Sequence, residues 1–480
     1  MQRVHIFVSC LFVVVLLFAV VARGPLAALS AGENALYLPL IIGGGNQPPG
    51  GDGEIGVTAA TYLGGDGEDS TSAVAVAPDD SVVLAGMMPG HNPGGATPVT
   101  LLGGGDGVVV RLDPDGQAVR SVTRIGATVT DLEINDSGNM VVCGAFGVAV
   151  LNATASETVW SADPGTGNRC ALGSDGTAAV LVGSTAYVYD SDGTPLDNWS
   201  ISGNGTNDIA VDGANNLVIA TGYTQVSGNL QVAFIRAWDY TGTLDWKSYD
   251  FSSAPGLGAD TRGERIAIGQ DGKLYFAGSI NGGTGASIFS RDPKDFDQKI
   301  DNDPRVVKTD DYTEAFGMAG SVKMTWFGRY EPTDGTLVTG QSLLTRRTSD
   351  NKGNSIGVNA ITADATGRVY LAGSASCCIK ERDSRQIAGI TVGGYEGSEA
   401  YFMALSADFK ERLVWTPFAG PDVSAGGSPA TGVGVRDGVV AVSISLNPKT
   451  DGTRSLITYQ ALQATPATLP EGYLAIWSFK

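Results

Sequence analysis

The stretch Ile266-Ala-Ile-Gly-Gln-Asp-Gly-Lys-Leu-Tyr-Phe-Ala-Gly278 places two short apolar runs on either side of a polar turn. The Asp-Gly pair in the turn provides a residue that adopts positive φ, which tight hairpin turns require. The apolar runs do not alternate with polar residues, and such runs are typical of strands that are covered on both faces. The stretch therefore predicts a buried β-hairpin.

The same pattern recurs along the chain, which predicts a repeat architecture. Its seven copies, the last of them degenerate, are Ala73–Gly86, Leu132–Gly144, Ala171–Gly183, Ile209–Gly222, Ile266–Gly278, Ile361–Gly373 and Val433–Ser443.

A second hairpin usually follows the first, as in Gly107–Gly116, Ala186–Gly193 and Val232–Gly242. Two hairpins make a four-stranded sheet, and a ring of such sheets is a β-propeller. We therefore predict an all-β fold over residues 57–480: a single seven-bladed β-propeller of four-stranded antiparallel blades.

The two ends of the repeat region are each incomplete. Val57–Leu63 resembles a fourth blade strand without the first three, and Gly472–Phe479 resembles a third strand without its fourth. Pairing them would complete the seventh blade and leave no open edge, which is an aggregation liability. We therefore expect these two segments to close the ring.

The repeat resembles a known family in the stretches Thr61-Tyr-Leu-Gly-Gly65 and Arg111-Leu-Asp-Pro-Asp-Gly116, together with the recurring hairpin. These residues are similar to the SBBP repeat, a seven-bladed β-propeller family. The resemblance covers roughly residues 57–480 and weakens at the short third blade and at the seventh. It implies a bacterial exported or surface protein, in a family mostly without an assigned activity, and it provides no catalytic motif.

The N-terminus has the pattern of a secretory signal peptide. Arg3 precedes the apolar run Ile6–Ala22, and small residues follow up to Ala31, the order typical of a cleaved signal. We expect a signal peptide at residues 1–31 and a Gly/Pro-rich tether at 32–56. An uncleaved anchor is the alternative, and it would be the protein's one association with a membrane.

Composition excludes several classes of protein. Hydrophobic residues make up 42% of the 480 residues, so the chain has enough apolar surface for a folded core. The 67 glycines indicate many turns, and the net charge of −19 disfavours nucleic acid as a partner.

A long insertion, Gly282–Gly320, interrupts blade five between its second and third strands. Inserted loops on a rigid scaffold commonly carry the contacts with partners. We therefore expect the neighbouring Trp326 and Tyr330 to contact a ligand.

The insertion is also rich in aspartate. Asp292, Asp295 and Asp297 are candidate contact residues. Asp301 and Asp303 are a candidate calcium site, with a solvated acidic loop as the alternative and no cofactor as the other expectation.

Four cysteines follow the signal segment. Cys143 and Cys170 lie in neighbouring blades and are expected either as a disulfide or as two buried thiols, while Cys377 and Cys378 are adjacent and are candidates for a vicinal disulfide. An exported protein can oxidise such cysteines.

Histidine is nearly absent, since His91 is the one histidine outside the signal segment. A Ser-His-Asp triad or a multi-histidine metal site would have to depend on it alone, and a solvated loop residue is the simpler interpretation.

The favoured function is a non-catalytic binding or scaffold module, secreted or on the cell surface, whose partner is a surface protein or a glycan. One alternative is a polysaccharide lyase or glycosidase, which carboxylates with raised pKa values in the central funnel would favour. A second alternative is a subunit of an extracellular assembly.

Overall fold

The computed structural model describes residues 55–226, 230–251, 259–281, 287–313, 322–395, 397–420, 428–447 and 455–479. The predicted signal peptide (residues 1–31), the tether up to residue 54 and the parts of the insertion at 282–286 and 314–320 lie outside these residues. Among the described residues, no helix is long and apolar enough to cross a membrane.

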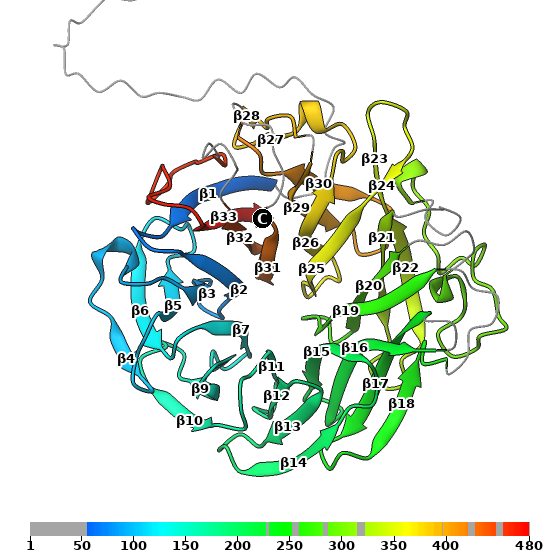
Figure 1. Ribbon diagram of the computed structural model, residues 1–480, viewed down its shortest axis with the longest axis horizontal. Helices are drawn as coiled ribbons and strands as arrows, with labels where there is room; N and C mark the ends of the chain where they lie inside the picture. The colour runs from blue at the N-terminus through cyan, green and yellow to red at the C-terminus, as the bar shows by residue number, and fades with distance from the viewer. Residues whose placement is uncertain are drawn as a thin grey trace, which may run out of the picture. The chain divides into compact units, whose positions relative to one another are not determined.

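Blades one to four follow one another along the chain (Figure 1). Blade one contains β2 (Ser70–Val76), β3 (Val82–Met87), β5 (Gly107–Leu112) and β6 (Val119–Ile125), with the 3-10 turn η1 (Pro93–Gly95) and with β4 (Val99–Leu101) added parallel to β6. Blade two contains β7 (Val129–Ile134), β8 (Met140–Gly144), β9 (Gly147–Leu151) and β10 (Thr158–Ala162). Blade three contains β11 (Arg169–Leu172), β12 (Ala178–Val182), β13 (Thr185–Tyr189) and β14 (Pro195–Ser200). Blade four contains β15 (Gly205–Asp212), β16 (Leu217–Gln225), β17 (Gln231–Asp239) and β18 (Leu244–Ser248).

Blades five and six carry most of the added structure. Blade five contains β19 (Asp260–Ile268), β20 (Leu274–Asn281), β21 (Lys323–Tyr330) and β22 (Leu337–Leu343), with η3 (Ile288–Ser290) and η4 (Asp311–Thr313) between β20 and β21. The short hairpin of β23 (Thr345–Arg346) and β24 (Gly353–Asn354) follows. Blade six contains β25 (Ile356–Ala363), β26 (Val369–Ser376), β29 (Ser398–Leu405) and β30 (Arg412–Pro417), with η5 (Arg382–Ser384), β27 (Gln386–Ile387) and β28 (Ile390–Thr391) between β26 and β29.

Blade seven is built from both ends of the ring. It contains β31 (Ala430–Arg436), β32 (Val439–Leu446), β33 (Glu471–Phe479) and, as its outer strand, β1 (Ile55–Leu63). β1 pairs antiparallel with β33 in a register that places Leu63 opposite Gly472. The predicted closure is confirmed, and the pairing starts two residues earlier than expected, at Ile55.

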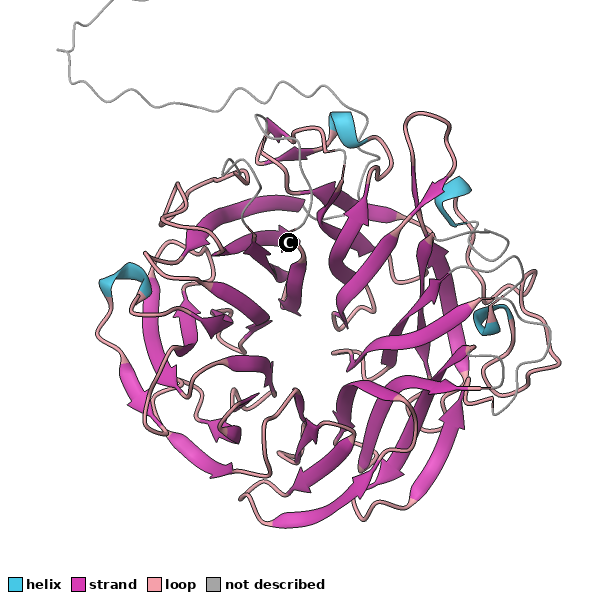
Figure 2. Ribbon diagram, viewed as in Figure 1, coloured by secondary structure: helices cyan, strands magenta, loops and turns pink. Residues whose placement is uncertain are grey.

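The described residues thus form seven β-sheet blades around a common centre, and the predicted seven-bladed propeller is confirmed (Figure 1). Within the described ranges, helix is confined to single 3-10 turns at the outside of the ring (Figure 2). The predicted insertion in blade five does lie between its second and third strands.

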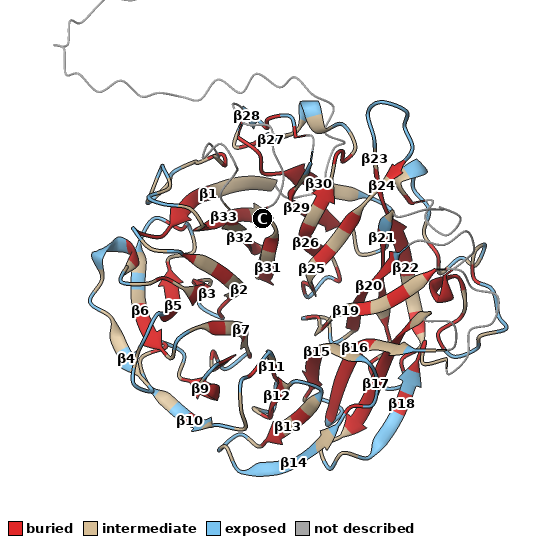
Figure 3. Ribbon diagram, viewed as in Figure 1, coloured by how far each residue is buried: buried red, intermediate tan, exposed pale blue. Residues whose placement is uncertain are grey.

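The core lies between neighbouring blades and not within a single sheet. The second strands, such as β3 and β8, are almost entirely buried, whereas the outer strands β14 and β18 are largely exposed (Figure 3). The continuous apolar runs therefore correspond to strands covered on both faces, as expected.

Candidate functional site

The innermost strand of each blade lines a central channel of about 600 Å³. These strands are β2, β7, β11, β15, β19, β25 and β31, which surround the centre of the ring in Figure 1.

A polar residue at a β-bulge recurs on the innermost strand of six blades. The extra residue in each strand is Ser72, Thr130, Asn207, Glu264, Asn359 or Thr431, and β11 of blade three pairs with its neighbour without a bulge. A bulge bends the strand and re-aims one side chain, here towards the next blade.

Five of the six bulge side chains bind the next blade around the ring, whereas Glu264 accepts from Ser279 Oγ of its own blade at 2.6 Å. Ser72 Oγ donates to the Val129 carbonyl at 2.8 Å, and Thr130 Oγ1 donates to the Gly167 carbonyl at 2.7 Å. Asn207 and Asn359 donate in the same way to Gly263 (2.7 Å) and Ala430 (2.9 Å). At the closing junction, the Thr431 and Thr71 hydroxyl oxygens lie 3.0 Å apart. Each bond contributes about 1 kcal/mol to the packing of one blade against the next.

A cluster of charged side chains lies on one side of the channel, on blades two to five. It consists of Asp131 and Glu133 on β7, Arg169 on β11, Asp208 on β15 and Arg265 on β19. Arg169 makes two long ion pairs, at 3.7 Å to Asp131 and at 3.9 Å to Asp208.

The three carboxylates of this cluster also bind backbone N–H groups of the following blade. Asp131 accepts from Cys170 at 3.2 Å, and Glu133 accepts from Leu172 at 2.6 Å. Asp208 accepts from the Ile266 N–H at 3.0 Å. The carboxylates thus satisfy donors on inner strands that have no partner strand on the channel side.

Burial raises the pKa of Glu133 to about 8, and the charges of Asp131 and Asp208 add to the shift while the Leu172 N–H opposes it. Burial also raises the pKa of Asp131, although the charge of Arg169 opposes this. Raised pKa values in a channel are one mark of acid–base sites. The chemistry available here is proton donation by Glu133.

Trp326 and Tyr330 lie in the hydrophobic core with exposed fractions of 0%. Trp326 Nε1 donates to the Tyr330 hydroxyl at 2.9 Å, and that hydroxyl lies 3.0 Å from the hydroxyl of Tyr249. The structure corrects the expectation that these two aromatics face a ligand, because the third strand of blade five packs against blade four and Phe289 of the insertion covers Trp326.

The aspartates of the insertion do not gather into one site. Arg305 binds Asp292 and Asp303, each at 2.8 Å, while Asp295 and Asp297 are exposed. Within the described residues, no group of three or more His, Cys, Asp or Glu side chains is placed to hold a metal ion. Calcium at Asp301 and Asp303 stays a prediction, although Asp303 is already engaged by an arginine.

The cysteines divide into two kinds. Cys143 and Cys170 are buried free thiols on neighbouring blades, which is the second of the two expected states. Cys377 and Cys378 form the vicinal disulfide that was a candidate.

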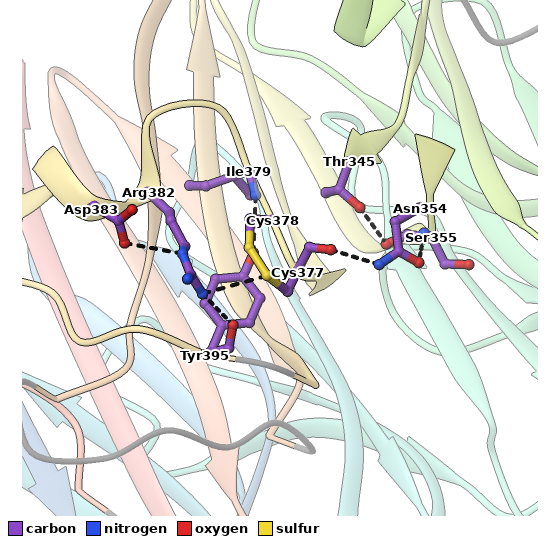
Figure 4. The surroundings of a disulfide bond; sticks show 9 residues. All are labelled: Thr345, Asn354, Ser355, Cys377, Cys378, Ile379, Arg382, Asp383 and Tyr395. Atoms are coloured by element: carbon purple, nitrogen blue, oxygen red, sulfur yellow. Dashed lines mark hydrogen bonds and ion pairs between the residues drawn. A yellow bond between two sulfur atoms is a disulfide. The ribbon is translucent and has the colours of Figure 1, made fainter. Parts of the chain in front are cut away.

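The disulfide lies where three segments meet (Figure 4). The Arg346 N–H donates to the Cys378 carbonyl at 3.0 Å, and the Cys378 N–H donates back to Arg346 at 2.6 Å. Asn354 Nδ2 donates to the Cys377 carbonyl at 2.6 Å, and the Ile379 N–H donates to the Tyr395 hydroxyl at 3.1 Å. The disulfide residues thereby join the β23–β24 hairpin to the excursion from blade six.

Residues 287–313, 344–355 and 377–395 pack together outside blades five and six, and we call them the rim extension. Asp310 is its centre: it accepts from Arg412 of β30 at 2.6 and 2.9 Å and from Lys380 at 3.1 Å. Burial alone would raise the pKa of Asp310, but these cations lower it to about 2. Arg346 adds an ion pair with Asp311 at 3.0 Å.

No protein-family model matches the chain, and no curated protein matches it. Among the solved structures that match, one described as "Crystal structure of RRP9 WD40 repeats" has 8% sequence identity and a TM-score of 0.49. That alignment covers 89% of this chain and 100% of the other.

Sequence reasoning missed the channel cluster, the bulge residues and Asp310. A signal for the first two exists, because a polar residue stands just before the first apolar run in most repeats, as at Ser72, Thr130 and Asn207. Asp310 and Arg412 are 102 residues apart in the sequence, and nothing local marks them as partners.

Proposed function

We propose that the protein is an exported, non-catalytic binding module, secreted or on the cell surface, whose contact surface is the rim extension. The observation that carries this proposal is the ordered packing of three separate excursions around Asp310 and the Cys377–Cys378 pair. A closed ring does not require these excursions, and fixing a residue costs about 1–2 kcal/mol of conformational entropy. Structure added to one side of a rigid scaffold is typical of binding loops.

The exposed part of the rim extension is charged and of mixed sign. Arg347 and Lys352 stand beside Asp350, and Glu381 and Asp383 are exposed nearby. None of the tryptophan, tyrosine and phenylalanine side chains described by the structure is exposed. A surface of this composition suits a protein partner with complementary charges better than a glycan that stacks on aromatic rings.

Export rests on the sequence of residues 1–31 and on the resemblance to the SBBP family. The test is to express the tagged full chain in a bacterium and measure the mass of the protein recovered outside the cytoplasm. Recovery there without residues 1–31 is expected, and retention of the intact chain in the cytoplasm would contradict the proposal.

The contact surface is tested by site-specific photo-crosslinking on producing cells. A crosslinker at Lys352 of the rim extension is expected to yield a discrete protein adduct. A crosslinker at Asn198, an exposed residue of β14 in blade three, is the matched control. Adducts at Asn198 and none at Lys352 would overturn the assignment of the surface.

The channel supports a second candidate function, a glycosidase or lyase with Glu133 as the acid. The observation in its favour is the raised pKa of Glu133 beside Asp131. The hydrogen bonds of both carboxylates to blade three make a structural role the favoured one. Cleavage of any polysaccharide in a panel by the wild type, abolished in Glu133→Gln, would establish the enzyme instead.

A further inference from the structure

The two halves of the ring closure each contribute a fully buried carboxyl group. Asp69 precedes β2 of blade one, Glu471 is the first residue of β33 in blade seven, and both have exposed fractions of 0%. A Cβ atom on Gly64 would lie 2.6 Å from Asp69 Oδ2 and 2.7 Å from Glu471 Oε1. Both carboxyl groups therefore converge on the backbone of Gly64, where a side chain would not fit.

Their hydrogen bonds are unequal. Glu471 accepts from Gln463 Nε2 and from the Ala467 N–H, both at 2.7 Å. Asp69 Oδ2 accepts from the Gly65 N–H at 2.6 Å, while Asp69 Oδ1 is buried without a partner in the described part of the chain. Both oxygens of Glu471 thus accept hydrogen bonds, as a carboxylate requires, whereas Asp69 Oδ1 accepts none from the described residues.

Neither group has a cation as its direct partner among the described ion pairs. Arg124 lies near Asp69, but its guanidinium donates to the carbonyls of Met88 and His91 and to Asn92 Oδ1. The other titratable groups that act on the pair are Asp66, His91 and Tyr62. Two converging buried carboxylates without a directly bound cation are unfavourable, even though the charges of Arg124 and His91 partly compensate that of Asp69. One of the two groups then keeps a proton.

We propose that Asp69 keeps a proton on Oδ1 while Glu471 stays ionised, and that this carboxyl–carboxylate pair is a pH-sensitive latch on the ring closure. Loss of the proton places two negative charges between blades one and seven. Repulsion between the two carboxylates then favours separation of blade seven, which contains β1 and β33, from blade one.

Electrostatics and solvent access agree with the latch. Burial raises the pKa of Asp69, although the Gly65 N–H and the charges of His91 and Arg124 oppose this shift. Burial and the charge of Asp69 raise the pKa of Glu471, although its hydrogen bonds from Ala467 and Gln463 oppose the shift. A cleft of about 650 Å³, lined in part by Gly64, Gly65 and His91, lies beside the pair. Protons can thus exchange with solvent next to the buried groups.

The sign of the pH effect follows from the raised pKa values. The folded ring holds a proton that the unfolded chain releases near the ordinary carboxyl pKa. The contribution of the pair to stability is therefore largest at acidic pH and falls as the pH rises through the raised pKa of the pair.

The test compares the wild type with Asp69→Asn from pH 4 to 9, using thermal unfolding and hydrogen exchange of residues 55–63. Asparagine keeps an acceptor for the Gly65 N–H and, like the protonated carboxyl group, carries no charge beside Glu471, so the variant mimics the protonated latch. We expect the wild type to lose melting temperature and exchange protection of β1 as the pH rises, and we expect the variant to lose much less of both.

Asp79→Asn is the matched control. Arg111 and Arg120 bind Asp79 at 2.7 Å, so its substitution is expected to leave the high-pH loss unchanged. An Asp69→Asn variant with the wild-type pH slope would overturn the proposal. So would a calcium-dependent rise in melting temperature that Asp69→Asn abolishes, because a cation would then hold the pair.

If Asp69→Asn does not fold, hydrogen exchange of the wild type alone decides. Protection of residues 55–63 that falls with pH more steeply than protection of β16 in blade four, after correction for intrinsic exchange, supports the latch. Equal slopes in the two strands would overturn it.

Discussion

Each blade must pack against the next one around the ring. Blades two and three do so with different residues from blades four and five. The strands β8 to β13 are four or five residues long, whereas β19 to β22 run from seven to nine. Between the short blades, carboxylates reach across to backbone N–H groups. Between blades four and five, the aromatics Tyr249, Phe289 and Trp326 fill the space instead.

This difference teaches where the ring can carry additional structure. The aromatic seam between blades four and five is filled mainly by apolar rings, and Asp208 binds the Ile266 N–H at its channel end. Insertions can therefore be added outside the rings without disturbing the carboxylate contact. We call the boundary between blades two and three the carboxylate seam, because Asp131 and Glu133 bind backbone N–H groups across it. Its stability depends on the protonation state of these two residues. The rim extension is accordingly built on blades five and six.

The largest expected effect is on the aromatic seam. Trp326→Ala removes a fully buried ring and should lower the free energy of unfolding by about 3–5 kcal/mol. Trp160→Ala in blade two should cost less, because the Trp160 Nε1 has no partner among the described residues, whereas the Trp326 Nε1 donates to the Tyr330 hydroxyl. Denaturant unfolding of both variants measures the difference, and equal losses would contradict the proposed contrast between the seams.

The next largest expected effect is a local loss of stability in the rim extension that leaves the ring folded. Asp310→Asn removes the charge that Arg412 and Lys380 share and should cost about 1–2 kcal/mol locally. Limited proteolysis should then cut within residues 287–313 while the ring stays intact. Because the cations lower the pKa of Asp310 to about 2, the wild-type contribution is present above pH 4 and is lost as the pH falls towards 2. Cleavage throughout the ring would show that the rim extension is not separable.

The carboxylate seam should respond to pH in the opposite direction. The pKa of Glu133 is raised to about 8, so the folded protein retains a proton that the unfolded chain loses near pH 4.5. Its contribution to stability falls as the pH rises from about 4.5 to 8. Glu133→Gln should flatten this part of the profile and raise the melting temperature at pH 8 relative to the wild type. A melting temperature below that of the wild type at pH 8 would mean that the ionised carboxylate holds the seam.

The smallest effect concerns the buried thiols. Alkylation without reduction should modify neither Cys143 nor Cys170 in the folded protein and both of them after denaturation. Cys377 and Cys378 should remain unmodified in both states, because they are bonded to each other. Peptide mass spectrometry distinguishes these results, and a Cys143–Cys170 crosslink would contradict the structure.

The ring could be predicted from sequence because its signals are local. An apolar run, a turn with a residue at positive φ and a second run define each hairpin, as Gly272 at φ 71° shows in blade five. The closure of blade seven followed from counting strands, since Val57–Leu63 and Gly472–Phe479 each lacked a partner.

The contact surface could not be predicted because its determinants are not local. A tryptophan in an apolar strand has the same sequence pattern whether it lies in the core or in a ligand site. Trp326 is a core residue because Phe289 of the insertion stacks on it, and the sequence does not show this contact. Asp310 differs from its acidic neighbours by meeting Arg412, and the sequence does not show that meeting. Asp69 and Glu471 are neighbours in space, but nearly the whole ring lies between them in the sequence.

The central claim is that the two ends of the chain close the ring in one register. Ala60 exchanges both backbone hydrogen bonds with Tyr459 on the far side of β1. Ala60 and Ala475 are therefore a non-hydrogen-bonded pair, the closer of the two antiparallel arrangements.

The most direct measurement is oxidation of an Ala60→Cys, Ala475→Cys variant followed by peptide mapping, with Ala59→Cys, Ala475→Cys as the control. We predict a crosslink and a higher melting temperature for the first pair only, because side chains of adjacent residues point to opposite faces of a strand. A crosslink in the control alone, or in neither variant, would contradict the closure.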